Sequence, residues 1–146
     1  MRISVKSKYA LAAAIILAKQ YSSENYVSTV SIAENLNISK IYLEQVFVLL
    51  KKSGVVASAK GTQGGYRLMK PPLQVTVYDI LSAVELSLFE PAGDLSDRPE
   101  INEVLQMLVF GKLDDAVKNT LGETTLAKLV EEIAKHTNSQ ELMFYI

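Results

Sequence analysis

The sequence predicts a mainly α-helical chain with a small β wing. A winged helix-turn-helix module is expected at residues 1–72 and a dimerisation and sensing region at residues 73–146. Three features support this fold class. Apolar residues recur at helical spacing through most of the chain, a glycine-rich turn at residues 60–65 separates two extended segments, and a long amphipathic stretch covers residues 100–121. With 146 residues, 49% of them hydrophobic, the chain is long enough to bury a core.

The first helix is expected at residues 4–20, because Leu11, Ala14, Ile15 and Ala18 repeat along one helix face. This apolar run follows several basic residues, as the core of a secretion signal would. It is too short to span a bilayer, however, and no A-x-A cleavage site follows it. We therefore interpret it as a helix of a cytoplasmic protein without a membrane segment.

The next two helices are short and are joined by a tight turn. Ser28 is expected to cap a helix at residues 29–36, and Ser39 a helix that reaches residue 53, with the turn at residues 35–38. The buried face of the third helix is expected to contain Leu43, Val46, Phe47 and Leu50. Two such helices, the second with a polar N-terminus that points outward, are typical of a helix-turn-helix.

A β-hairpin is expected after the third helix. Gly54 ends that helix, and residues 55–59 and 66–68 are extended segments on either side of the turn at residues 60–65. The turn carries Lys60, so the tip of the hairpin is cationic. A glycine-rich turn could also form a nucleotide phosphate site, but here a strand follows it and the GxGxxG spacing is missing. A wing beside the third helix explains the glycines better.

The second part begins with a fourth helix and a loop. Two prolines close the first module, and Thr76 caps the fourth helix with Asp79 in the position of a capping box. The buried face of this helix is expected to contain Val77, Ile80, Leu81 and Val84. Residues 86–99 are rich in proline and acidic side chains and are expected to form a surface loop. Because the loop is long, it is a candidate pocket for a small-ligand-gated regulator.

The long helix at residues 100–121 predicts a homodimer, because such a helix outside a winged helix is more often a dimer seam than a ligand site. Gly111 in its middle predicts a kink or a close helix crossing. Gly122 is expected to end it, and Thr124 and Thr125 to cap a last helix. The inward face of the last helix is expected to contain Leu126, Leu129, Val130 and Ile133.

Charge divides the chain into two unequal parts. Up to Lys70, ten basic residues stand against three acidic ones, which gives +7; from Pro71 onward, five basic residues stand against thirteen acidic ones, which gives −8. A basic module neutralises phosphates and releases their counterions, whereas an acidic one is repelled. We therefore expect the first module to bind double-stranded DNA, with ordinary solvated charge as the alternative. The wing glycines agree, because backbone without Cβ can approach the sugar-phosphate surface closely.

Residue types exclude several classes of function. The chain has no cysteine, which excludes disulfides, thiolate zinc sites and a cysteine nucleophile. The single histidine, His136, is remote from any evident nucleophile, and no spacing of carboxylates and histidines suits a metal. We expect neither an enzyme nor a cofactor or metal. A protein-interaction adaptor that has lost DNA binding is a further alternative, against which the +7 module argues.

Four stretches resemble the Rrf-type winged-helix regulators, the group that contains IscR, NsrR and CymR. These stretches are Met-Arg-Ile-Ser at residues 1–4, Ile-Ser-Lys-Ile-Tyr-Leu-Glu-Gln at residues 38–45, Lys-Gly-Thr-Gln-Gly-Gly-Tyr at residues 60–66 and Thr-Thr-Leu at residues 124–126. The resemblance covers nearly the whole chain. It implies a transcriptional repressor that binds palindromic operators as a homodimer.

By this resemblance, the third helix reads DNA and the wing reaches an adjacent minor groove. Glu44 and Gln45 are implied to read base edges, Glu44 by accepting from cytosine and Gln45 by pairing with adenine. Two alternatives remain open: Tyr42 packs against the first helix, and Glu44 is a plain solvated residue. The full set of candidate DNA-binding residues is Arg2, Lys8, Ser28, Thr29, Ser39, Lys40, Tyr42, Leu43, Glu44, Gln45, Lys60, Gly61, Gly64 and Tyr66.

The lack of cysteine places the chain beside one branch of that group. Cluster-binding members carry three cysteines in the segment that corresponds to residues 86–101, where this chain has none. It therefore resembles the cluster-free CymR branch, which regulates cysteine metabolism together with cysteine synthase. The resemblance implies that Phe144, Tyr145 and Ile146 at the C-terminus dock into that enzyme. The alternative is that the tail packs on its own dimer.

Overall fold

The computed structural model describes residues 3–21, 24–91 and 93–144. Within these ranges the chain is mainly helical and has one two-stranded antiparallel sheet, which confirms the predicted fold class. The elements in chain order are α1 (Val5–Lys19), α2 (Thr29–Leu36), α3 (Lys40–Lys52), β1 (Val56–Ala59), β2 (Gly65–Leu68), the 3-10 turn η1 (Pro72–Gln74), α4 (Val77–Val84), α5 (Pro99–Leu105), the π-helical segment η2 (Gln106–Phe110), α6 (Gly111–Gly122) and α7 (Leu126–Phe144).

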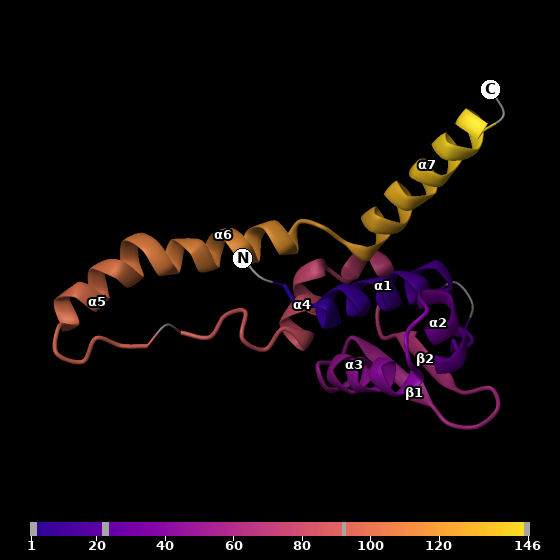
Figure 1. Cartoon of the computed structure of the whole chain (residues 1–146), viewed down its shortest axis with the longest axis horizontal. Helices are drawn as coiled ribbons and strands as arrows, with labels where there is room; N and C mark the ends of the chain where they lie inside the picture. Colours follow the sequence, from indigo (N-terminus) through magenta and orange to yellow (C-terminus); the bar gives the residue numbers. More distant parts are fainter. Residues whose placement is uncertain (1–2, 22–23, 92, 145–146) are drawn as a thin grey trace.

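Helices α1 to α4 and the hairpin form one compact body, from which α5–α6 and α7 extend in different directions (Figure 1). In this body α1 packs against α3 and α4. Its contact face contains the fully buried Ala10, Ala13 and Ala14, whose small side chains let the helices approach closely. The largest fully buried side chain, Phe47 of α3, belongs to the same core.

The beginning of α7 belongs to the compact body as well. The Leu126 side chain is fully buried in the core, and its backbone N–H donates to the Val75 carbonyl at 2.9 Å. Val77 N donates to the Thr124 carbonyl at 2.9 Å in the same way. The core therefore includes residues from beyond the predicted boundary at residue 72, and that boundary stays a prediction.

The predicted helix caps are present. Ser28 Oγ accepts from Ser31 N at 3.1 Å. In α4, Thr76 Oγ1 accepts from Asp79 N at 3.1 Å while Asp79 accepts from Thr76 N at 2.9 Å, which completes the capping box. These side chains satisfy backbone donors that the first turn of a helix leaves without partners. The helix starts therefore lie where the sequence predicts them.

Glu85 joins the end of α4 to the beginning of α1. One of its oxygens, Oε2, accepts from Ser4 N at 3.0 Å, Ser4 Oγ at 2.7 Å and Ser7 Oγ at 2.6 Å. Ser7 is fully buried. The hydrogen bonds from Ser7 and Ser4 lower the pKa of the Glu85 carboxyl. Glu85 is therefore an anionic clasp between two helices of the body.

The predicted long helix is interrupted by a π-helical turn. The segments α5, η2 and α6 follow one another without a break, and Gly111 N donates to the Gln106 carbonyl across the wider turn. A Cβ at Gly111 would lie 2.7 Å from Gln106 O, so glycine fits where a larger residue would collide with backbone. The irregularity expected near Gly111 is thus a π-turn and not a helix crossing.

This helical arm carries many exposed apolar side chains. Met107, for example, is 65% exposed. The exposed apolar residues of the arm, here called the arm face, are Ile101, Val104, Met107, Leu108, Val109, Phe110 and Leu113.

The last helix packs against the body only at its beginning. Leu126 is buried, and Leu129 and Val130 are half-buried and pack against the core, as predicted. Ile133 is half-buried, and from Ala134 onward the described side chains of α7 are exposed, since α7 projects away from the core (Figure 1). Within the described ranges, no helix combines the length and apolarity that a membrane span requires.

Candidate nucleic-acid interface

Helix α3 has one buried and one exposed face. Its buried face has no accessible surface at Leu43, Val46, Phe47 and Leu50. Ser39 precedes the helix, and its Oγ accepts from Tyr42 N at 3.1 Å, which fixes the first turn. The exposed side chains are Lys40, Ile41, Glu44, Gln45, Val48, Lys51 and Lys52. The helix therefore offers a polar and partly cationic surface to a ligand.

A tight turn sets α2 against α3. Asn37 ends α2 in the left-handed conformation with φ 53°, which asparagine adopts more readily than most residues. Ile38 N then donates to the Ala33 carbonyl at 3.0 Å. The two helices pack on each other beyond this turn. The predicted helix-turn-helix is thus confirmed.

The hairpin is fastened to the beginning of α2. Strands β1 and β2 pair in antiparallel register, with Val56 opposite Leu68 and Ala59 opposite Gly65. Beyond the hairpin, Val27 and Tyr66 exchange two backbone hydrogen bonds of 2.9 Å each. Gly65 makes this approach possible, because a Cβ on it would lie 2.0 Å from Val27 O.

Tyr66 holds the hairpin against α3. Its ring stacks on Phe47 with ring centroids 4.0 Å apart and an interplanar angle of 6°. Burial raises the pKa of the Tyr66 phenol, and the negative charge of Glu44 raises it further, so the phenol is uncharged at neutral pH. At the other end of α3, Lys51 Nζ donates to Ser58 Oγ of β1 at 2.7 Å. These contacts fix the hairpin relative to α3.

A groove of about 410 Å³ lies between the beginning of α2, the exposed face of α3 and the hairpin. Polar side chains and glycine backbone line it, and lysines approach it from two elements. Lys40 and Glu44 form an exposed ion pair at 3.8 Å in its wall, and such pairs contribute roughly 0–1 kcal/mol, so a ligand can separate them. The predicted residues that line the groove are Ser28, Thr29, Lys40, Glu44, Lys60, Gly61, Gly64 and Tyr66.

The other predicted residues lie outside the groove. Gln45 and Ser39 are exposed at α3 and its cap, and Lys8 is exposed on α1. Tyr42 is half-buried and meets Tyr9 of α1 edge-on, with ring centroids 5.8 Å apart and an interplanar angle of 82°. Its ring therefore packs against the first helix, as the alternative interpretation held. Arg2 lies outside the described residues.

The prediction that Leu43 contacts DNA is wrong. Its side chain is 0% exposed and belongs to the core between α3 and α1. Leu43 is a candidate because it stands in the Tyr-Leu-Glu-Gln stretch that carries the resemblance. The helical pattern of the same stretch assigns it to the apolar face. Leu43 therefore supports the interface from below and does not touch a ligand.

Several groove residues are absent from the predicted set. Val30, Ser58 and Thr62 line the groove beside the predicted residues. Ser58 shares a strand face with the buried Val56, so the two-residue period of a strand would not have identified it. Thr62 lies at the hairpin tip next to two predicted glycines. Val30 is apolar, and a search for polar contacts overlooks it.

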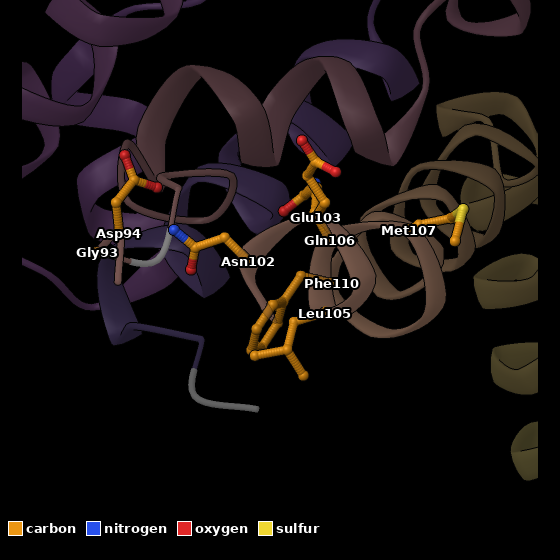
Figure 2. Close-up of a pocket in the computed structure, with 8 residues that line it drawn as sticks. All are labelled: Gly93, Asp94, Asn102, Glu103, Leu105, Gln106, Met107 and Phe110. Atoms are coloured by element: carbon orange, nitrogen blue, oxygen red, sulfur yellow. The ribbon is translucent and has the colours of Figure 1, made fainter. Parts of the chain in front are cut away.

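A second hollow of about 540 Å³ lies on the helical arm, between the preceding loop and α5–η2 (Figure 2). Asn102 ties the loop to the helix: its Oδ1 accepts from Leu95 N at 3.1 Å and its Nδ2 donates to Leu95 O at 3.3 Å. The lining residues are Gly93, Asp94, Asn102, Glu103, Leu105, Gln106, Met107 and Phe110. Of the predicted loop at residues 86–99, Gly93 and Asp94 line this hollow.

The Rrf2 family model, described as "Iron-dependent Transcriptional regulator", matches residues 3–132. The residues of this chain do not offer the ligands that iron requires. The chain has no cysteine, and its one histidine, His136, is exposed on α7 with Nε2 3.1 Å from Gln140 Nε2. Among the described residues no group of three or more His, Asp or Glu could hold a metal ion. The chain thus does not fit an iron or iron–sulfur site.

Similar proteins of known name are transcriptional regulators, not enzymes. The chain is 36% identical to CymR of Bacillus subtilis over 148 aligned positions, which covers 100% of both chains. Its structure is similar to that of B. subtilis CymR, with a TM-score of 0.73 over 90% of this chain and 98% of that one at 36% identity. It also resembles IscR of T. potens, with a TM-score of 0.68 over 91% and 88% of the two chains at 32% identity. The chain has a winged helix-turn-helix, matches the family model over residues 3–132 and is similar to these relatives. It therefore belongs to the Rrf2 family of DNA-binding transcriptional regulators.

Proposed function

We propose that this regulator is a repressor that binds palindromic operators as a homodimer through the groove and the exposed face of α3. The observation that carries the proposal is the groove itself, in which lysines and glycine backbone from α3 and the hairpin surround one opening. It lies in the module whose charge is +7. Phosphate oxygens are the ligands that such a site attracts.

The candidate residues take two kinds of role. Ser28, Thr29, Ser39, Lys40 and the hairpin tip around Lys60 position phosphates, because they present hydroxyls, ammonium groups and open backbone at the groove and its rim. Glu44 and Gln45 read base edges from the exposed face of α3. Tyr66 and Tyr42 act indirectly, since their rings hold the hairpin and α1 against α3. Gly61 and Gly64 let the hairpin tip approach the backbone of DNA.

The arm face supports the homodimer. Its apolar side chains are uncovered within one copy, and a soluble chain rarely leaves so many neighbouring ones in water. A second copy of the same helix would bury them in a two-fold symmetric interface. Two recognition helices would then face successive major grooves, and a palindromic site follows from that symmetry.

Selection from a pool of random duplexes tests the proposal. The recovered sequences are expected to converge on an inverted repeat with half-sites about 10–10.5 base pairs apart, or a multiple of that spacing. Sedimentation of the protein is expected to show a dimer. A pool that fails to converge, or a monomeric protein, contradicts the proposal.

We further propose that the regulated pathway is cysteine metabolism. The solved relative from B. subtilis is described as a global cysteine regulator, and this chain aligns with it from end to end. We also propose cysteine synthase as a partner that holds the C-terminal tail. The last described turns of α7 leave Leu142 and Met143 exposed, which supports an accessible tail, while Tyr145 and Ile146 lie outside the described residues.

Deletion of Ile146 separates a docked tail from one that packs on its own dimer. If the tail docks, the melting temperature stays the same and calorimetry shows lost affinity for cysteine synthase. A lower melting temperature, or an unchanged affinity for the enzyme, favours the packed tail. The hollow on the arm favours a second candidate, a regulator gated by a small ligand. Isothermal titration of metabolite extracts fractionated by size would reveal such a ligand.

A further inference from the structure

The outermost stripe of α3 is apolar at two of its four positions. A helix turns once every 3.6 residues, so the residues opposite the buried face recur at i, i+4, i+7 and i+11. Ile41 is 71% exposed and Val48 is 61% exposed on this stripe. We call it the outer stripe, and its members are Ile41, Gln45, Val48 and Lys52.

The surroundings of the outer stripe indicate what covers it. Lys40 and Lys51 flank it on α3, Lys52 belongs to it, and Lys60 stands on the neighbouring hairpin. Of the acidic residues, only Glu44 lies on this helix. A partner with this charge complement is a polyanion, and an apolar protein face would leave the lysines buried without counter-charges. The surface therefore fits DNA better than a protein.

The major groove offers an apolar contact in one place, the C5-methyl group of thymine. We propose that Ile41 and Val48 each contact a thymine methyl group, on either side of the base pair that Gln45 contacts. This assignment rests on the proposed function and adds specificity residues to it. It makes the outer stripe of α3 a reader of thymine and adenine, beside Glu44, which is proposed to read a base edge as well.

The spacing of the two contacts follows from helix geometry. Ile41 and Val48 are seven residues apart, which is about 10 Å along the helix axis at 1.5 Å per residue. Base pairs in a duplex are about 3.4 Å apart, so a helix lying along the groove brings the two side chains to thymines about three base pairs apart. Each half-site of the selected operator is therefore expected to contain two thymines at this spacing.

Replacement of thymine by deoxyuridine tests the proposal, because it removes the methyl group and keeps the base pairing. With the selected operator and the full-length protein, deoxyuridine at a contacted position in one half-site is expected to weaken binding about fourfold, as burial of one methyl group implies. The same change in both half-sites is expected to weaken it about fifteenfold. Ile41→Ala and Val48→Ala are each expected to abolish this sensitivity at one thymine and to keep it at the other.

Leu73→Ala is the matched control. Leu73 is 72% exposed, close to the value for Ile41, but it lies in η1, which packs against α7. This variant is expected to retain the wild-type response to deoxyuridine at both positions. Circular dichroism melting curves check that all three variants are folded, which their exposure predicts.

The outcomes separate this proposal from the function on which it rests. If the wild-type protein binds its selected operator but responds to deoxyuridine by less than twofold at every thymine, the proposal is overturned and the function stands. A selected half-site that contains no thymine would also overturn this proposal and leave the proposed function standing. If Ile41→Ala stays as sensitive as the wild type at both positions, Ile41 is not the reader, and the same holds for Val48. If the protein selects no sequence at all, the proposed function fails and this proposal fails with it.

Discussion

Replacement of Gly65 by alanine is expected to detach the hairpin from the rest of the winged helix. Gly65 has φ +142°, a conformation that residues with a side chain rarely adopt. An added Cβ would lie 2.0 Å from Val27 O and 2.5 Å from Val27 C, and both are backbone atoms that no rotamer change can move. The chain can relieve this collision only by separating β2 from the segment before α2.

The size of the effect follows from what this separation breaks. Val27 and Tyr66 lose two backbone hydrogen bonds of 2.9 Å, each worth about 1 kcal/mol net. Backbone strain adds about 1–3 kcal/mol. The free energy of unfolding is therefore expected to fall by roughly 3–5 kcal/mol, which corresponds to a melting temperature lower by about 10–15 °C for a chain of this size.

Thermal melts followed by circular dichroism measure this loss. Gly122→Ala is the control, since a Cβ there meets nothing within 4 Å and Gly122 is the last residue of α6. It is expected to leave the melting temperature unchanged or to raise it slightly. Gly61→Ala tests backbone strain alone, because φ is +97° and the space is open, so an intermediate loss is expected. A melting temperature of Gly65→Ala within 2 °C of the wild type, roughly 0.5 kcal/mol, would refute the reasoning.

The remaining predictions concern charge, assembly and pH. Lys60→Ala is expected to weaken binding to all DNA sequences alike and to reduce the salt slope by about one, whereas Gln45→Ala costs about 1–3 kcal/mol only against the correct base, as salt titrations on matched and mismatched duplexes would show. Met107→Asp, in the arm face, is expected to give a monomer in sedimentation, because it would place a charge in the proposed dimer interface. Glu85→Gln is expected to lower the melting temperature above pH 5. Because the pKa of Glu85 is lowered in the fold, the difference from wild type is present above its ordinary value of 4.5 and shrinks as pH falls below it; a pH-independent difference contradicts the clasp.

Local rules were sufficient to predict the helix-turn-helix from the sequence. Ser28, Ser39 and Thr76 mark helix starts by hydrogen bonds that each makes within its own first turn, so no distant contact is needed to identify them. Gly54 stops α3 for an equally local reason, a positive φ of 78°. The same applies to the apolar face of α3, whose period is visible in the residues themselves.

The errors occur where distant parts of the chain decide the outcome. The exposure of α7 from Ala134 onward cannot be predicted from its sequence alone, because burial depends on a neighbouring element. The π-turn before Gly111 depends on the close approach of Gln106 O, which spacing does not encode. The wing gives another example. Its glycines are expected to let the backbone approach DNA, but Gly65 is required because its backbone lies against Val27.

The sequence predicts which residues form the candidate site better than it predicts how these residues are arranged. Most of the predicted polar residues line one groove, because the short turn between α2 and α3 and the hairpin that follows leave few ways to arrange them. What the sequence could not supply is the stacking of Tyr66 on Phe47, by which this candidate DNA-binding residue also supports the hairpin. A resemblance motif also mixes contact residues with core residues, as Leu43 demonstrates.

The most direct test of sequence-specific binding compares two duplexes at the same salt concentration. One is the inverted repeat obtained by selection, and the other has the same base composition in shuffled order. Fluorescence anisotropy with the wild-type protein is expected to give an affinity for the repeat at least about 10³-fold higher than for the shuffled duplex, as base contacts from α3 imply. Equal affinities for the two duplexes would mean that the basic module binds only phosphate, and would contradict a regulator that reads its operator through α3.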